Sequence, residues 1–219
     1  MSFSNQWNYL YSNNTNISIW PWSDLISLYF NYFNKKNKKK IRILELGCGA
    51  GANIPFFLNK KFDYYGLDGS NYIIKKLKKK YPKIKRNLVC ADFTKQIPFN
   101  LKFDLIIDRA SITCNNQVSI KNTINFIYNK LNKKGMFIGI DWYSTLTTDF
   151  KKGEFDKDKY TKKNMKNSIF KGAGSFHFCN EKLIKNYFKN FKVKNLEHKL
   201  IEYKINKKKL ATWTIVVEK

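Results

Sequence analysis

Apolar and polar positions separate the middle of the chain into short strand-like runs and longer helix-like stretches. The strand-like runs cover residues 41–46, 63–67, 88–91, 103–107 and 136–140. The helix-like stretches between them cover 52–60, 70–80 and 117–131. Short apolar strands that alternate with helices predict parallel βαβ units with right-handed crossovers, and therefore an open sheet with helices on both faces.

The N-terminal part has a different pattern. Residues 1–34 are rich in aromatic side chains and asparagine, and Pro21 and Ser23 before Asp24 predict the start of a helix. A lysine-rich linker over 35–40 then leads into the first strand.

After the fifth strand the pattern becomes irregular before it turns regular again. Residues 142–180 form a long glycine-containing segment, and loops of this length are usually either functional or disordered. A helix is expected near 181–190. The apolar stretches 191–203 and 210–217 follow, and the second is strongly β-prone.

The residues that follow the five strands share a chemical character. Asp68, Asp92, Asp108 and Asp141 each follow a strand, and the first strand ends in a glycine turn. Ligands of open α/β sheets bind beyond the carboxyl ends of the strands. A single aspartate at such a place is equally explained by turn or N-cap chemistry. The set, together with the glycine turn, predicts a ligand site.

The glycine turn has the strongest local signal. Gly47, Gly49 and Gly51 lie between a strand containing Glu45 and the start of a helix. Glycine permits positive φ and close approach of a ligand to the backbone, and the helix start offers unpaired N–H groups. Asp68 ends the next strand, where a carboxylate can accept both hydroxyls of an adenosine ribose.

The third strand adds a matching pair. Asp92 can accept an exocyclic amine of adenine while Phe93 packs on the ring. With the glycine turn, Asp68 and the strand that ends at Asp108, these residues resemble the class I S-adenosylmethionine-dependent methyltransferases. The similarity is clear over 41–141 and weaker over the C-terminal elements.

The resemblance implies a fold and a cofactor. The fold is an open, mostly parallel seven-stranded sheet flanked by helices, Rossmann-like and doubly wound, with a C-terminal antiparallel hairpin and a small cap. The resemblance also implies that S-adenosylmethionine is bound. The methionine part of the cofactor would contact Glu45, Gly47, Gly49 and Gly51. Its ribose would bind to Asp68, and its adenine would contact Asp92 and Phe93. Asp108 would form the floor beneath the sulfonium.

We therefore expect one domain over 1–219 with four parts. They are an N-terminal cap and helical segment (1–40), a cofactor-binding core (41–141), a substrate-cap insertion (142–180), and a C-terminal helix and hairpin (181–219).

Several residues are candidates for work on the acceptor. Asp141 and His177 are candidate bases, although an N-cap or a salt bridge to a lysine would equally explain Asp141, and packing in a loop would explain His177. Arg109 can bind a carboxylate or phosphate through its fork of donors. Trp142 and Tyr143 follow Asp141 on the expected substrate side. Two further tryptophans, Trp20 and Trp22, either pack in the core or close over the cofactor. We expect core packing for Trp20 and closure over the cofactor for Trp22.

The expected acceptor is a small molecule, with an oxygen of a sugar-like or anionic metabolite as the preferred target, because two capping segments would enclose a modest cavity. RNA is an alternative acceptor, although two subclasses of RNA methyltransferase are disfavoured. Arg109 and Ala110 stand where enzymes that methylate base amines carry paired prolines. Enzymes that methylate cytosine C5 need a cysteine that usually follows proline, whereas Cys114 follows Thr113. An oxidoreductase that binds NAD(P) is a second alternative, since Gly47, Gly49 and Ala52 satisfy the looser dinucleotide spacing. A catalytically silent cofactor-binding protein is a third.

Composition changes this picture little. The chain has 42 Lys and Arg against 16 Asp and Glu, a net charge of +26. This excess either attracts a polyanion or reflects codon bias. Codon bias is an explanation because lysine occurs together with many Asn, Ile, Phe and Tyr, all of which have A/T-rich codons. The four cysteines show no paired spacing and the two histidines give no zinc pattern, so we expect small, buried thiols, a reducing compartment and no metal. With no signal sequence and no apolar run of about 18 residues, a cytoplasmic location is expected.

Overall fold

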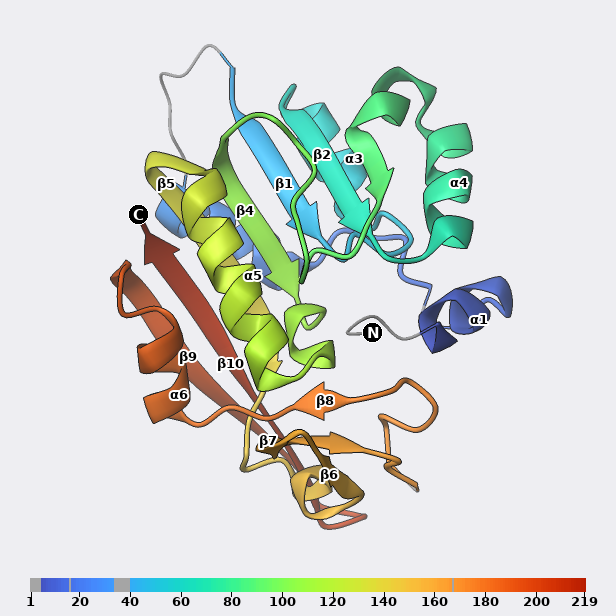
Figure 1. The fold of residues 1–219 in the computed structure, drawn as a ribbon, viewed down its shortest axis with the longest axis vertical. Coiled ribbons are helices and arrows are strands. Elements are labelled where there is room, and N and C mark those ends of the chain that lie inside the picture. Colours follow the sequence, from blue (N-terminus) through green and yellow to red (C-terminus); the bar gives the residue numbers. More distant parts are fainter. Residues whose placement is uncertain (1–4, 16, 34–39, 167) are drawn as a thin grey trace.

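A seven-stranded sheet forms the centre of the molecule (Figure 1), with the strand order β3-β2-β1-β4-β5-β10-β9. The computed structural model describes residues 5–15, 17–33, 40–166 and 168–219, so the predicted linker lies outside the described residues except for Lys40. The strands of the sheet are β1 (Arg42–Leu46), β2 (Asp63–Asp68), β3 (Leu88–Cys90), β4 (Phe103–Arg109), β5 (Leu131–Tyr143), β9 (Lys192–Tyr203) and β10 (Lys208–Glu218). β1 to β5 run parallel, and β10 is antiparallel to β5 and β9. The predicted sheet and hairpin are confirmed.

Helices cover both faces of this sheet. They are α1 (Gln6–Ser12), α2 (Ser23–Leu28) with a π-helical continuation (Tyr29–Phe33), α3 (Ile54–Asn59), α4 (Asn71–Lys80), α5 (Gln117–Lys130) and α6 (Glu181–Tyr187). Short 3₁₀ segments cover Pro82–Asn87, Ile112–Cys114 and Thr148–Lys151. One core cluster joins one face of the sheet to α5 and α6, and a second joins the other face to α2, α3 and α4.

Alternation along β1 explains this division. Leu44 and Leu46 point to one face and share a core cluster with Ile124 of α5. Ile43 points to the other face and shares a cluster with Phe57 of α3. Because strand side chains alternate between faces, a strand with buried apolar residues on both faces must be covered on both sides. Ile43 on one face of β1 and Leu44 and Leu46 on the other therefore account for the three-layer arrangement.

β5 is longer than predicted at both ends. The predicted strand covers 136–140, whereas β5 begins at Leu131 and continues to Tyr143, where Trp142 and Tyr143 pair with β10. Asp141 therefore lies inside a strand, with φ +56°, a conformation that aspartate tolerates better than most residues.

The segment 142–180 is more regular than expected. It contains a second, three-stranded antiparallel sheet of β6 (Glu154–Asp156), β7 (Asp158–Lys163) and β8 (Phe176–His177). Its apolar side chains, Phe170, Phe176 and Phe178 among them, form a separate small core. Partly buried side chains of α1 pack against that core. We call this part the cap sheet; Figure 1 shows it at the bottom of the view, beside the start of β10.

The cysteines follow the expectation only in part. Cys48 and Cys179 are buried, Cys114 is half-buried, and all four thiols are free. Cys90 is exposed, because it ends the edge strand β3, so the expectation of burial was wrong for this residue. Among the described residues, no helix has the length and apolar character needed to cross a membrane.

Candidate active site

A cavity of about 610 Å³ lies at the carboxyl ends of the parallel strands. The lining residues that the sequence had singled out are Gly47, Asp68, Asp92, Phe93, Arg109, Tyr143 and Trp22. The other lining residues are Trp7, Tyr11, Asn14, Ile17, Ser18, Gly69, Ala91, Ala110, Ser111, Cys114 and Asn115. Residues from five strand ends and from the N-terminal segment thus meet in one place.

The glycine turn is positioned by its backbone. Gly47, Gly49 and Gly51 all have positive φ, between +49° and +79°. A Cβ on Gly47 would lie 2.3 Å from Cβ of Ser111, so no side chain fits there. The N–H groups of Gly47 and Cys48 donate to the Leu67 carbonyl, which fixes the turn beside the end of β2. Of the three glycines, only Gly47 lines the cavity.

Asp68 lines the cavity as a buried carboxylate. Its Oδ2 accepts the N–H of Gly49 at 3.0 Å and its Oδ1 accepts that of Ser70 at 2.8 Å. Burial raises its pKa to about 6, although these two bonds act in the opposite direction. A carboxylate oxygen has two acceptor positions, so each oxygen can accept one further hydrogen bond.

Glu45 lies behind the turn instead of in the cavity. Its two oxygens accept Asn53 Nδ2 at 2.8 Å and the hydroxyl of Tyr64 at 2.5 Å. Burial raises its pKa to about 7 against the effect of these bonds. Asn53 Oδ1 in turn accepts the backbone N–H of Trp22 at 3.2 Å. Glu45 therefore connects the glycine turn to the N-terminal segment.

The end of β3 supplies Asp92 and Phe93 to the cavity wall. Oδ1 of Asp92 accepts the N–H and hydroxyl of Thr94, at 2.9 and 2.6 Å, which holds the turn after the strand. Phe93 is largely buried and lines the cavity. The pair joins a carboxylate and an aromatic surface at the same strand end.

Asp108 and Trp142, expected as a cofactor contact and a substrate contact, instead support the wall from behind. Oδ1 of Asp108 accepts the N–H groups of Ser111 and Ile112 at 3.1 and 3.0 Å and contacts the Ser111 hydroxyl. Oδ2 accepts the indole N–H of Trp142 at 2.8 Å. Neither side chain lines the cavity, and Trp142 is fully buried in the sheet core. Burial raises the pKa of Asp108 to about 6.

Arg109 lies between two partners at the far end of the cavity. Its guanidinium carbon is 3.5 Å from the ring centroid of Trp22, and one amino group forms an ion pair with Asp141. The other oxygen of Asp141 accepts the Thr212 hydroxyl at 3.3 Å. Asp141 does not line the cavity, so the structure gives it the place of a counter-ion, as the salt-bridge alternative predicted, with arginine in place of lysine.

His177 does not reach the cavity. It is fully buried, and its two ring nitrogens lie 2.8 Å from the hydroxyls of Thr161 and Tyr187. Burial lowers its pKa to about 4, while nearby Asp158 acts in the opposite direction. The structure therefore speaks against His177 as the base and favours the packing alternative, because β8 lies between β7 and α6.

The N-terminal segment covers the cavity, and within this segment the sequence had singled out Trp22 but no residue of α1. Trp7 and Tyr11 of α1 both line it, and their spacing of four residues is the signal that could have identified them. Asn8 fixes α1 by accepting the hydroxyl of Ser70 at 2.9 Å. Trp20, favoured for core packing, is 78% exposed, so that expectation was wrong.

Tyr143, at the end of β5, also lines the cavity. Burial raises the pKa of the Tyr143 phenol well above its usual range, so the group stays protonated and can donate. Its ring packs against Phe170 and Phe176 of the cap-sheet core. Among the described residues of 142–180, only Tyr143 lines the cavity, so the cap sheet supports the wall indirectly.

Comparison with known proteins agrees with this geometry. Residues 43–135 match a family model described as a methyltransferase domain. The chain is similar to an S-adenosylmethionine-dependent methyltransferase from Clostridium acetobutylicum (20% identity, TM-score 0.63, 96% of this chain and 95% of that one). It is also similar to TehB from Haemophilus influenzae (17% identity, TM-score 0.63, 98% of this chain and 67% of that one). A third similar structure is Haemonchus contortus phosphoethanolamine N-methyltransferase 2 with phosphomonomethylethanolamine and S-adenosylhomocysteine (12% identity, TM-score 0.64, 98% of this chain and 56% of that one). No curated protein matches the chain.

Proposed function

We propose that this chain, a class I S-adenosylmethionine-dependent methyltransferase, methylates a small anionic metabolite that binds beside Arg109. The observation that carries the proposal is the charge arrangement of the cavity. Asp68 and Asp92 lie at the ends of β2 and β3, and Arg109 lies at the end of β4. The carboxylates suit the nucleoside and cationic donor, and the guanidinium suits an anion.

The residues present fit the donor. Asp68 is a buried carboxylate without a cationic partner among the described residues, and each of its oxygens accepts one backbone N–H. The two hydroxyls of a ribose would supply the remaining hydrogen bonds. Phe93 and Ala91 offer an apolar surface for the adenine, with Asp92 in reach of its amine. Gly47 allows the methionine part to approach the backbone.

The chain's own residues have three tasks. When bound, S-adenosylmethionine supplies a methyl group on a positively charged sulfur, which needs no further activation. The protein aligns the acceptor with that group, and alignment alone can remove roughly 7–11 kcal/mol of barrier. Trp22 and Asp141 hold the guanidinium of Arg109 in place, and Tyr143 donates to the acceptor. Trp7 and Tyr11 exclude water.

The acceptor class follows from Arg109. Its planar donors match a carboxylate or phosphate. The Haemonchus structure contains phosphomonomethylethanolamine, a phosphate-bearing small molecule, which agrees with an anionic acceptor. An oxygen nucleophile would be favoured if Asp141 or His177 acted as a base, but neither residue lines the cavity. We therefore propose alignment, and no dedicated base, as the source of rate.

Titration calorimetry with S-adenosylmethionine tests the donor site. Asp68→Asn removes one charge-assisted interaction, so we expect affinity to fall by about 10- to 100-fold. Asp63→Asn, on the same strand but paired with Lys40 at its other end, should bind like the wild type. Absent binding to the wild type would reject the proposed function, whereas equal affinity of the two variants would remove Asp68 from the ribose role.

Arg109→Gln tests the acceptor class. With a panel of small carboxylates, phosphates and neutral alcohols, released S-adenosylhomocysteine reports turnover. We expect anionic compounds to be turned over by the wild type and their KM to rise by about 10-fold or more in Arg109→Gln. Donor affinity should not change. Arg86→Gln removes the same charge from an exposed position and is the control. Preferential turnover of neutral compounds, or an unchanged KM, would contradict the anionic acceptor.

A further inference from the structure

The second half of α4 and the 3₁₀ segment after it carry an unusual concentration of positive charge. Residues 71–87 contain eight basic side chains and no Asp or Glu: Lys75, Lys76, Lys78, Lys79, Lys80, Lys83, Lys85 and Arg86. A stretch of this length would contain about three at the chain's average, since 42 of 219 residues are Lys or Arg. We call these eight side chains the α4 basic surface.

All eight side chains are exposed, and among the described residues no ion pair joins any of them to a carboxylate. The cap sheet is different, although it is also rich in lysine. Residues 148–171 contain eight lysines but four carboxylates, and Lys152 there pairs with Asp149. General lysine enrichment therefore does not account for the missing acids on α4.

The fold gains only weak contacts from this surface, among them Lys76 Nζ over the Tyr72 ring at 4.7 Å and Lys80 Nζ over the Tyr81 ring at 5.4 Å. Lys78 to Lys80 lie in the last turn of α4, where cations interact favourably with the helix dipole. Lys75 and Lys79, like Lys76 and Lys80, are four residues apart, and like charges at this spacing destabilise a helix. The remaining basic residues lie beyond the helix end. Repulsion between these lysines destabilises the protein when it is alone, and a bound anion would offset that repulsion.

The surroundings identify the kind of anion. The apolar side chains of α4, Ile73, Ile74 and Leu77, are buried against the sheet, so the helix has no free apolar face to enter a membrane. A row of exposed cations without apolar anchors is suited to the phosphate backbone of a nucleic acid. None of the eight side chains lines the cavity, so the surface lies outside the methyl-transfer site.

We propose that the α4 basic surface binds the phosphate backbone of a nucleic acid. This function goes beyond methyl transfer: the nucleic acid is a partner of the enzyme and not the methyl acceptor. Binding is electrostatic, so it is independent of sequence and sensitive to salt.

The test uses the whole protein and a short, mixed-sequence, fluorescently labelled single-stranded RNA. The variant replaces Lys75, Lys76, Lys79 and Lys83 by Gln. The matched control replaces Lys182, Lys189, Lys192 and Lys194 by Gln; these exposed lysines lie at the opposite edge of the sheet, around α6 and the start of β9 (Figure 1). Both proteins lose the same charge, and a thermal melt establishes that both are folded.

We expect the α4 variant to bind the RNA at least about tenfold more weakly, with a slope of log affinity against log salt that is shallower by about 0.7 per lost contact. The control should bind nearly as the wild type does. The melting temperature of the α4 variant should be unchanged or higher, because repulsion within the helix is relieved. Replacement of the same four lysines by Arg should preserve binding.

Three results would overturn the proposal. They are absence of RNA binding by the wild type at low salt, equal weakening in the two Gln variants, and binding to vesicles rich in anionic phospholipid without binding to RNA. Methylation of the RNA itself would also contradict the separation of this surface from the acceptor site.

Discussion

Gly47 and Gly172 have the same backbone requirement but different surroundings. Both adopt positive φ, +67° and +80°, yet a Cβ on Gly47 would collide with Ser111 whereas one on Gly172 would meet nothing within 4 Å. Gly172→Ala should therefore cost only the left-handed backbone term, about 1–2 kcal/mol. Gly47→Ala should cost about 3 kcal/mol or more, because overpacking is added.

Urea denaturation measures both variants. Ser111→Gly in the Gly47→Ala background removes the clash and should restore part of the lost free energy of unfolding. Equal destabilisation by the two alanines, or no recovery in the double variant, would show that packing against Ser111 does not determine this position.

At the scale of elements, His177 connects the cap sheet to the rest of the domain. It joins β8 to Thr161 of β7 and Tyr187 of α6, and Asp158 lies 3.6 Å from Nδ1. Gln117 at the start of α5 donates its N–H to the same Asp158, at 3.0 Å. One buried cluster thus holds two strands and two helices together.

The pH dependence of this cluster follows from the lowered pKa. The folded-state pKa of His177 is about 4 against 6.5 for the free side chain, so the unfolded state binds more protons between these values. The contribution to stability is therefore complete above pH 6.5 and is lost as the pH falls towards 4. Hydrogen exchange should show β7 and β8 opening more readily at pH 5 than at pH 7, after correction for intrinsic rates.

His177→Gln should abolish this pH difference while the amides of β1 and β4 provide the internal reference. The variant should be less stable than the wild type at pH 7, since a buried hydrogen bond is lost. Turnover by the folded fraction should persist, because His177 does not line the cavity. A pH-independent wild type, or loss of turnover without loss of stability, would contradict this role.

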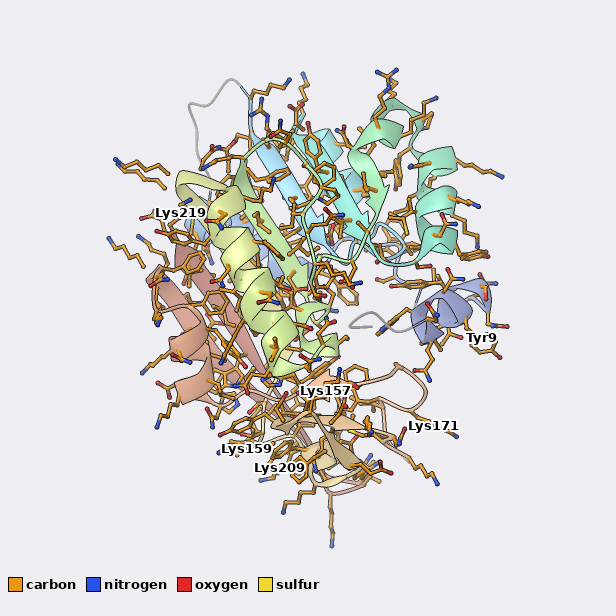
Figure 2. All side chains as sticks on the ribbon, viewed as in Figure 1. Tyr9, Lys157, Lys159, Lys171, Lys209 and Lys219 are labelled. Carbon is orange, nitrogen blue, oxygen red and sulfur yellow. The ribbon has the colours of Figure 1, made fainter. Side chains whose placement is uncertain are left out.

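At the scale of the whole molecule, the charge of +26 opposes folding. Lysine side chains project from all sides of the ribbon, with Lys157, Lys159 and Lys209 at the cap-sheet end and Lys219 at the other (Figure 2). Salt screens such repulsion over about 8–10 Å at physiological strength. The melting temperature should therefore rise by a few degrees between low and moderate sodium chloride.

An uncharged osmolyte at equal osmolality is the control, because it separates screening from general exclusion effects. A melting temperature that is flat or falls with added sodium chloride would show that the charges are too far apart, or too well hydrated, to matter for stability.

The parallel strands and several of the residues that line the cavity could be predicted from the chain alone. Burial on both faces makes a parallel strand rich in apolar residues, so β1 to β4 can be recognised in the sequence as short apolar runs. Because parallel strands end at one edge of the sheet, Gly47, Asp68 and Asp92 had to lie near one another. Local sequence thus determined both the element and the side of the sheet on which its last residue lies.

Only the tertiary structure decided which side chains face the cavity and which lie behind it. Glu45, Asp108 and His177 resemble the lining residues in sequence, but each has its polar atoms occupied by buried partners. The stacking of Trp22 on Arg109 and the covering helix α1 depend on contacts between distant segments. Spacing along a chain fixes where a strand ends, whereas orientation and burial depend on neighbours that only folding brings together.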